Sequence, residues 1–348
     1  MSEKETTRTE ISELGEFGLI DALTKNIIIK NKSTVKGVGD DTAVIEKNDE
    51  KFTLITTDLL IEGVHFDMIY TPLKHLGYKA AIVNFSDIVA MNGNPQQLII
   101  GLSASNRFSV EALEEIYSGV YLACEKYGVD LVGGDTTSSP SSLFLSLTAI
   151  GEIKKEKIAY RSTAKSGDLI CVSGDLGGAY MGLLILEREK KVFQDNPEIQ
   201  PDLDGNDYLI GRQLKPEARL DIINKLEKEK IIPTSMIDIS DGLASEILHI
   251  CKNSNLGCAL YEEKLPIDVT TAGAANEFGL DPTTAAMNGG EDYELLFTIS
   301  QSDYEKIKNI KDISIIGHIA EKSEGSNLIS TSGHIVEIKA QGWDALKK

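Results

Sequence analysis

Six short Gly/Asp clusters are spread along the chain and could carry chemistry. They read GVGDD, TTD, NFSD, GGD, DISDG and GGED, and they occupy residues 37–41, 56–58, 84–87, 133–135, 238–242 and 289–292. Any single one would more often be a turn or a helix cap, because Gly and Asp suit turn conformations. Together they offer carboxylates and Thr hydroxyls, the hard oxygen ligands that suit Mg²⁺. If the fold gathers these loops, the sequence indicates a magnesium site.

Such a site favours chemistry on phosphate groups. Carboxylates and phosphates repel each other in a partly dry cleft, and bridging divalent cations remove that repulsion and stabilise charge during phosphoryl transfer. A GxxxxGK[ST] loop and a complete GxGxxG pattern are both absent from the sequence. The Gly-rich turn within 173–186 could hold a phosphate at a helix N-terminus, but we favour a purely structural start of a helix there.

Other catalytic arrangements find little support in the residue types. The sequence has five histidines and four cysteines, without HExxH, CxxC or comparable ligand spacing. We also recognise no Ser-His-Asp or Cys-His arrangement, so no catalytic nucleophile is expected. Zinc and copper sites are disfavoured for the same reason.

Composition narrows the class of protein. With 348 residues the chain is long enough for two domains. Its formal net charge of −19 disfavours binding to nucleic acid or to anionic membranes. We find no signal-peptide pattern and no run of about 18 apolar residues, so export and membrane spanning are not expected. Four cysteines without a scaffold pattern suit reduced thiols in the cytoplasm.

Apolar periodicity predicts interleaved strands and helices, which is typical of an α/β or α+β fold. Predicted strands lie at 52–56, 98–103, 143–150 and 169–173. Predicted helices lie at 10–25 and 111–126, the second ended by Gly128. The charged, turn-rich stretch 153–168 predicts a boundary between domains 1–152 and 153–348. Residues 187–206, rich in Asp, Glu and Pro, are expected to form a surface loop.

In order, the chain carries the motifs GVGDDTAVI, TTDLLIEGVHF, KAAIVNFSDIVAMNGNP, LVGGDTT, RSTAKSGD, MIDISDGL and NGGEDYELLF. This series resembles the thiamine-monophosphate kinase family over nearly the whole chain. The resemblance implies two α/β domains of the aminoimidazole-ribonucleotide synthetase-like architecture, a homodimer, and transfer of phosphate from ATP to thiamine monophosphate with several Mg²⁺ ions.

The resemblance also implies roles for individual residues. Gly134, Asp135, Arg161 and Ser240 would bind ATP, and His65, Glu291 and Trp343 would bind thiamine monophosphate. The implied magnesium ligands are Asp41, Thr56, Thr57, Asp58, Asp87, Asp135, Asp238 and Asp241. Each also has a structural interpretation. His65 could be a satisfied buried histidine, for example, and Glu291 part of a Gly-Gly turn before a strand at 293–299.

Related functions remain open at this point. Aminoimidazole-ribonucleotide synthetase is the main alternative, and a nucleotide-binding dimer without catalytic activity is another. Selenophosphate synthetase would carry a reactive cysteine or selenocysteine near its start, and the related hydrogenase maturation factor a terminal cysteine. Here the first cysteine is Cys124 and the sequence ends WDALKK.

Overall fold

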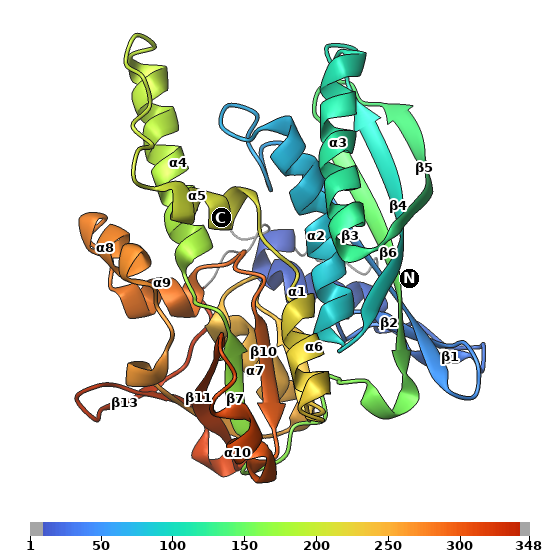
Figure 1. Ribbon diagram of the computed structural model, residues 1–348, viewed down its shortest axis with the longest axis vertical. Helices are drawn as coiled ribbons and strands as arrows, with labels where there is room; N and C mark the ends of the chain where they lie inside the picture. Colours follow the sequence, from blue (N-terminus) through green and yellow to red (C-terminus); the bar gives the residue numbers. More distant parts are fainter. Residues whose placement is uncertain (1–9, 342–348) are drawn as a thin grey trace, which may run out of the picture.

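The computed structural model describes residues 10–341, whose strands form two sheets (Figure 1). The first sheet has the order β1-β2-β3-β6-β4-β5, and only β4 and β5 pair in parallel. Its strands are β1 (Thr34–Lys36), β2 (Ala43–Glu46), β3 (Lys51–Ile61), β4 (Asn94–Ala104), β5 (Asp130–Ser138) and β6 (Phe144–Lys154). Burial alternates along β6, as expected for a strand with one covered face.

The second sheet has the order β13-β12-β9-β11-β7-β10-β8, with β9 and β12 the parallel pair. Its strands are β7 (Leu169–Ser173), β8 (Ser235–Asp238), β9 (Gly257–Tyr261), β10 (Leu295–Ile299), β11 (Ile313–Ala320), β12 (Ser326–Ile329) and β13 (Ile335–Glu337). All residues of β8 and β10 are buried, so this part of the sheet is covered on both faces.

Helix α2 (Leu73–Ala90) lies between the first sheet and the second half of the chain and is buried along most of its length. Helix α3 (Val110–Tyr127) packs closely against it (Figure 1). Two glycines permit this approach: a Cβ on Gly77 would lie 1.8 Å from the Ile116 carbonyl oxygen, and one on Gly119 would lie 1.9 Å from the Lys74 oxygen. The position of α2, which carries part of the site described below, thus depends on these glycines.

The remaining helices surround the second sheet and the junction between the sheets. They are α1 (Ile11–Thr24), α4 (Gly178–Asp195), α5 (Asp207–Leu214), α6 (Leu220–Lys228), α7 (Leu243–Ser254), α8 (Val269–Glu277), α9 (Pro282–Asn288) and α10 (Tyr304–Ile307). Among residues 10–341, no helix is both long and apolar enough to cross a membrane.

One hydrophobic cluster contains residues from both sheets and from α2, including Phe85, Met236 and Phe297. All strands of the first sheet precede residue 155, and all those of the second follow residue 168. Because a shared core joins the two groups of strands, the division into domains 1–152 and 153–348 stays a prediction.

The interleaved α/β architecture is confirmed, and the predicted strands and helices are present with shifted ends. Helix α1 has a break at Gly15, where φ is 65°. The predicted loop at 187–206 is wrong over its first part, because α4 continues to Asp195 through EREKKVFQD, which contains several good helix formers. The rest of this stretch is tied back to α4, since the Asp202 N–H donates to the Glu189 carboxylate at 2.8 Å.

Candidate active site

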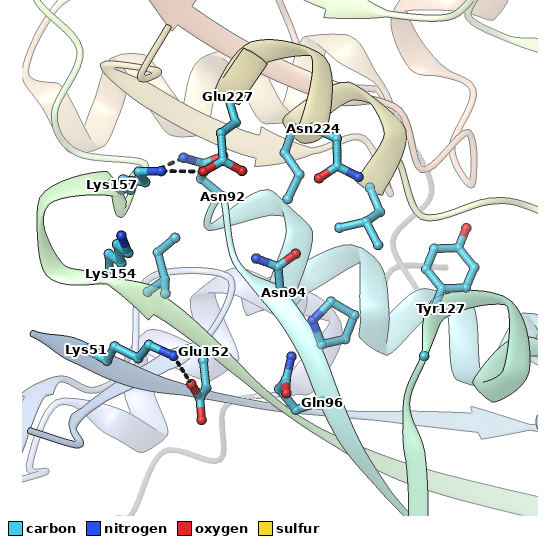
Figure 2. Close-up of a pocket in the computed structure, with 15 residues that line it drawn as sticks. Lys51, Asn92, Asn94, Gln96, Tyr127, Glu152, Lys154, Lys157, Asn224 and Glu227 are labelled. Atoms are coloured by element: carbon cyan, nitrogen blue, oxygen red, sulfur yellow. Dashed lines mark hydrogen bonds and ion pairs between the residues drawn. The ribbon is translucent and has the colours of Figure 1, made fainter. Parts of the chain in front are cut away.

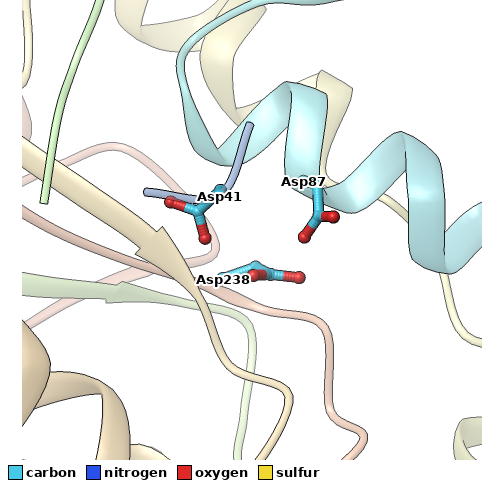
Figure 3. Close-up of side chains that lie close together, drawn as sticks. All are labelled: Asp41, Asp87 and Asp238. Carbon is cyan, nitrogen blue, oxygen red and sulfur yellow. The ribbon is translucent and has the colours of Figure 1, made fainter. Parts of the chain in front are cut away.

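Three aspartates from distant parts of the sequence meet where α2 packs against β8 of the second sheet. Asp41 lies in the loop between β1 and β2, Asp87 near the end of α2, and Asp238 at the end of β8. Their carboxylates point toward one another (Figure 3), and one oxygen of each lies within 4.8 Å of the others. The fold therefore gathers three of the predicted Gly/Asp clusters at one point.

Hydrogen bonds hold each of these carboxylates. The hydroxyl of Thr56 on β3 donates to Asp87, and the hydroxyl of Ser86 donates to Asp238. Arg161 binds Asp41 with two groups, Nε to Oδ2 at 3.0 Å and Nη2 to Oδ1. Such a bidentate pair fixes the plane of the carboxylate. Two predicted site residues, Thr56 and Arg161, therefore each contact the cluster by donating hydrogen bonds to one of its aspartates.

The electrostatics of the cluster favour a bound cation. Burial raises the pKa of Asp87 well above its usual range, and the neighbouring carboxylates raise it further. Burial and Asp41 raise the pKa of Asp238 to about 7, and burial raises the pKa of Asp58 to about 6. The Asp58 Oδ2 atom is inaccessible to water and has no hydrogen-bond partner in the described structure. A divalent cation would offset this repulsion, so these oxygens fit Mg²⁺.

A cavity of about 910 Å³ opens beside the cluster. Its wall includes Glu16, Tyr70, Tyr180 and Leu280, which combine apolar surface with polar groups. Seven residues predicted to bind metal, ATP or thiamine monophosphate line it. They are Asp58, His65, Asp87, Asp238, Ser240, Asp241 and Glu291. Because the carboxylate cluster lies at one side of this cavity, a ligand in it can reach the predicted metal site.

His65 and Glu291 both line the cavity and lie close enough to interact electrostatically. The His65 Nδ1 atom accepts a hydrogen bond from the Ile61 N–H at 3.0 Å, and burial lowers the His65 pKa although Glu291 opposes the shift. Glu291 has a left-handed backbone, with φ of 66°, as does Tyr293, with φ of 51°. Regular pairing therefore begins at Leu295, later than the predicted strand at 293–299.

Some predicted residues lie away from the cluster. Gly134 and Asp135 are on β5, the exposed edge strand of the first sheet. A Cβ on Gly134 would lie 1.9 Å from the Ile100 carbonyl oxygen, so this glycine also has a packing role between β4 and β5. Thr57 is exposed, and its hydroxyl donates to the Leu147 oxygen at 2.9 Å. Trp343 lies outside the described residues.

The Gly-rich turn before α4 has the structural role that we favoured. The N–H groups of Gly177 and Ala179 donate to the Asp292 carboxylate at 2.7 and 3.2 Å. This buried carboxylate satisfies the helix N-terminus, the point at which a phosphate would otherwise bind.

A second, smaller cavity of about 350 Å³ lies between β4, β6 and α6 (Figure 2). Its acidic side chains are paired with lysines: Glu152 contacts Lys51 at 2.9 Å, and Glu227 contacts Lys157. None of the clustered aspartates lines it. We therefore place the active site in the larger cavity.

Lys79 is a residue of the larger cavity that the sequence analysis missed. The side chains of Lys79, Val83 and Asp87 all line this cavity from α2. Their spacing of four residues repeats along one face of a helix, and this signal could have predicted Lys79.

Comparison with known proteins identifies the family. Residues 39–153 match the family model of the AIR synthase related protein N-terminal domain. The chain is 37% identical to the thiamine-monophosphate kinase of Buchnera aphidicola subsp. Schizaphis graminum, over 95% of this chain and 99% of that protein. It is 36% identical to the enzyme of Aquifex aeolicus, over 96% and 98% of the two chains.

A solved structure extends this agreement to three dimensions. The structure of AaThiL complexed with AMPPCP and TMP matches with a TM-score of 0.80 and 33% identity, covering 98% of this chain and 99% of that one. The full-length sequence similarity and the shared fold agree, and the chain belongs to the thiamine-monophosphate kinase family.

Proposed function

We propose that this protein transfers the γ-phosphate of ATP to thiamine monophosphate, which yields ADP and thiamine diphosphate. The observation that carries the proposal is the meeting of Asp41, Asp87 and Asp238 beside a cavity large enough for an organic phosphate. Family membership supports the substrates, because the related structure named above holds an ATP analogue together with TMP.

We propose Mg²⁺ as the metal. Asp41, Asp87 and Asp238, together with Asp58 and Asp241 in the cavity wall, would hold it. Bound Mg²⁺ would neutralise phosphate charge and orient the reacting groups. Ser240, which lies in the cavity wall, and Arg161 are proposed to contact the nucleotide.

The chain's own residues have a positioning task in this reaction. The acceptor phosphate has a second pKa near ~6, so it is largely a dianion at neutral pH and needs no general base. Arg161 and Ser86 hold the carboxylates of Asp41 and Asp238 in fixed orientations. His65 and Glu291 line the part of the cavity proposed for the organic portion of the acceptor. We propose direct transfer without a phosphorylated enzyme.

We also propose a homodimer formed through the outer face of the first sheet. Helices α2 and α3 cover the inner face, while Leu59, Ile99 and Val132 are 59%, 37% and 56% exposed. Asp135 on the edge strand β5 is exposed too. Pairing of two copies would cover these apolar side chains. Light scattering at micromolar concentration should give about twice the chain mass, and Ile99→Lys should shift it toward the monomer. A wild-type monomer would refute the dimer.

A cytoplasmic location belongs to the same proposal. Its support is the state of the four cysteines, which are all buried free thiols.

The activity test mixes the protein with ATP, MgCl₂ and thiamine monophosphate, followed by chromatography of the thiamine compounds. We expect thiamine diphosphate, and we expect none in excess EDTA. A parallel reaction contains formylglycinamidine ribonucleotide, the substrate of an aminoimidazole-ribonucleotide synthetase. Turnover of that compound without thiamine diphosphate would favour the alternative. Nucleotide binding without any turnover would favour an inactive binding protein.

A further inference from the structure

Lys79 is a buried cation in the wall of the larger cavity. Its side chain is only 5% exposed. A lysine that is buried to this extent almost always has a charged or polar partner. Its Nζ atom lies 2.9 Å from the Glu291 Oε1 atom and 3.0 Å from the Gln213 carbonyl oxygen. Lys79 thus connects α2 to α5 and to the loop that carries Glu291.

Glu291 is held from two sides. Besides Lys79 at Oε1, the side-chain amide of Gln213 donates to Oε2 at 2.5 Å. The Glu291 side chain is 29% exposed, so part of it faces the cavity, which it lines. Two partners on different helices leave this carboxylate a single orientation.

The backbone at Glu291 is strained and is held by contacts of its own. Its left-handed φ of 66° costs energy for a residue with a side chain, and strain of this kind persists only where surrounding contacts impose it. The Glu291 N–H donates to the Ser240 oxygen at 2.7 Å, and the following Asp292 is fixed at the start of α4. These contacts hold the backbone, whereas Lys79 and Gln213 hold the side chain.

Lys79 lies about two helical turns before Asp87 on α2. It precedes Asp87 by eight residues, which is about 12 Å along a helix axis. Its Nζ atom is already engaged by Glu291 and Gln213. A direct role in phosphate binding is therefore disfavoured, and a role through Glu291 remains.

We infer that Lys79 is a positioning residue for the acceptor substrate: its ammonium group fixes the Glu291 carboxylate in the orientation that contacts the organic part of the acceptor. The inference rests on the proposed function, in which Glu291 lies at the acceptor end of the cavity. Without Lys79, the partly exposed Glu291 side chain would turn toward solvent and lose that orientation.

The test compares Lys79→Met with Lys308→Met, which removes a lysine that pairs with Glu305 on the surface at 2.7 Å. We expect Lys79→Met to raise the KM for thiamine monophosphate about tenfold, because it breaks a largely buried pair, and to leave the KM for ATP within about twofold. Lys308→Met should change neither constant. Thermal melting of each variant reports whether the fold is retained.

A double-mutant cycle tests the route through Glu291. In the Glu291→Gln background, Lys79→Met should raise the acceptor KM by less than about threefold further, since its partner charge is already gone. Gln213→Leu removes the second anchor of Glu291 and should also raise the acceptor KM selectively. This variant keeps the test open if Lys79→Met does not fold.

Several outcomes would overturn the inference. A lower acceptor KM in Lys79→Met would mean that the ammonium group only repels a cationic substrate. Equal increases in both KM values would indicate a structural role, and a selective increase for ATP would indicate nucleotide binding. Additive effects of Lys79→Met and Glu291→Gln would show independent action. Wild-type protein that does not phosphorylate thiamine monophosphate would instead refute the proposed function itself.

Discussion

Magnesium binding to the carboxylate cluster should depend strongly on pH. Asp238 and Asp58 have pKa values raised to about 7 and about 6, mainly by burial. These values lie above those of the unfolded chain, so protonation at low pH stabilises the metal-free fold, and this contribution is lost as pH rises through 6 to 7. Mg²⁺ competes with these protons, and its binding therefore strengthens over the same range.

The size of the effect follows from the two pKa values. At about pH 5.5, protonation of Asp238 weakens binding by about 30-fold and protonation of Asp58 by about fourfold, relative to about pH 8. Together they predict a loss of affinity of about 100-fold. The raised pKa of Asp87 acts in the same direction.

Isothermal titration calorimetry with MgCl₂, without nucleotide, measures this dependence. Titrations in buffers of different ionisation enthalpy should show more proton release on binding near pH 6 than near pH 8. In Asp238→Asn, which keeps the side-chain size, the pH dependence should be weaker than in the wild type, because Asp58 and Asp87 still titrate but Asp238 no longer does. Wild-type affinity that changes less than about threefold between the two pH values would refute the proposed role of these carboxylates.

Asp87→Asn should lower kcat at least about 100-fold, because it removes a proposed metal ligand. It should not lower the melting temperature of the metal-free protein, because it removes one of several mutually repelling charges. A kcat equal to that of the wild type would contradict this prediction. Gly77→Ala should lower the free energy of unfolding by about 2–3 kcal/mol in denaturant titrations, because its Cβ would lie 1.8 Å from the Ile116 oxygen. Gly211→Ala, with no atom near its Cβ, is the control, and equal stability of the two variants would refute the close helix contact. His65→Ala should raise the KM for thiamine monophosphate more than that for ATP; equal changes would mean a structural role.

The meeting of Asp41, Asp87 and Asp238 could be predicted as a hypothesis from the sequence. Each lies in a Gly/Asp cluster, and their residue types suit one kind of ligand. The partners of these aspartates could not be predicted in the same way. That Arg161 contacts Asp41 across 120 positions of sequence depends on how the two sheets pack.

Thr57 shows a signal that the sequence analysis did not use. Side chains on a strand alternate between faces, so Thr56 and Asp58 on β3 cannot point to the same side as Thr57. In the structure Thr56 reaches Asp87, whereas Thr57 bonds to Leu147 on the outer side. The predicted role of Asp135, binding ATP and Mg²⁺, could not be judged in this way. Its edge strand is exposed, and its surroundings depend on whether a second copy is bound.

The most direct test of the central claim follows the transferred phosphate. Protein, MgCl₂, thiamine monophosphate and ATP labelled in the γ-phosphate are mixed, and the products are separated. We predict that the label appears in the terminal phosphate of thiamine diphosphate, and that protein quenched before acceptor is added carries no label. Label released only as inorganic phosphate would contradict the account, as would stoichiometric label on the protein that passes into thiamine diphosphate when acceptor is added.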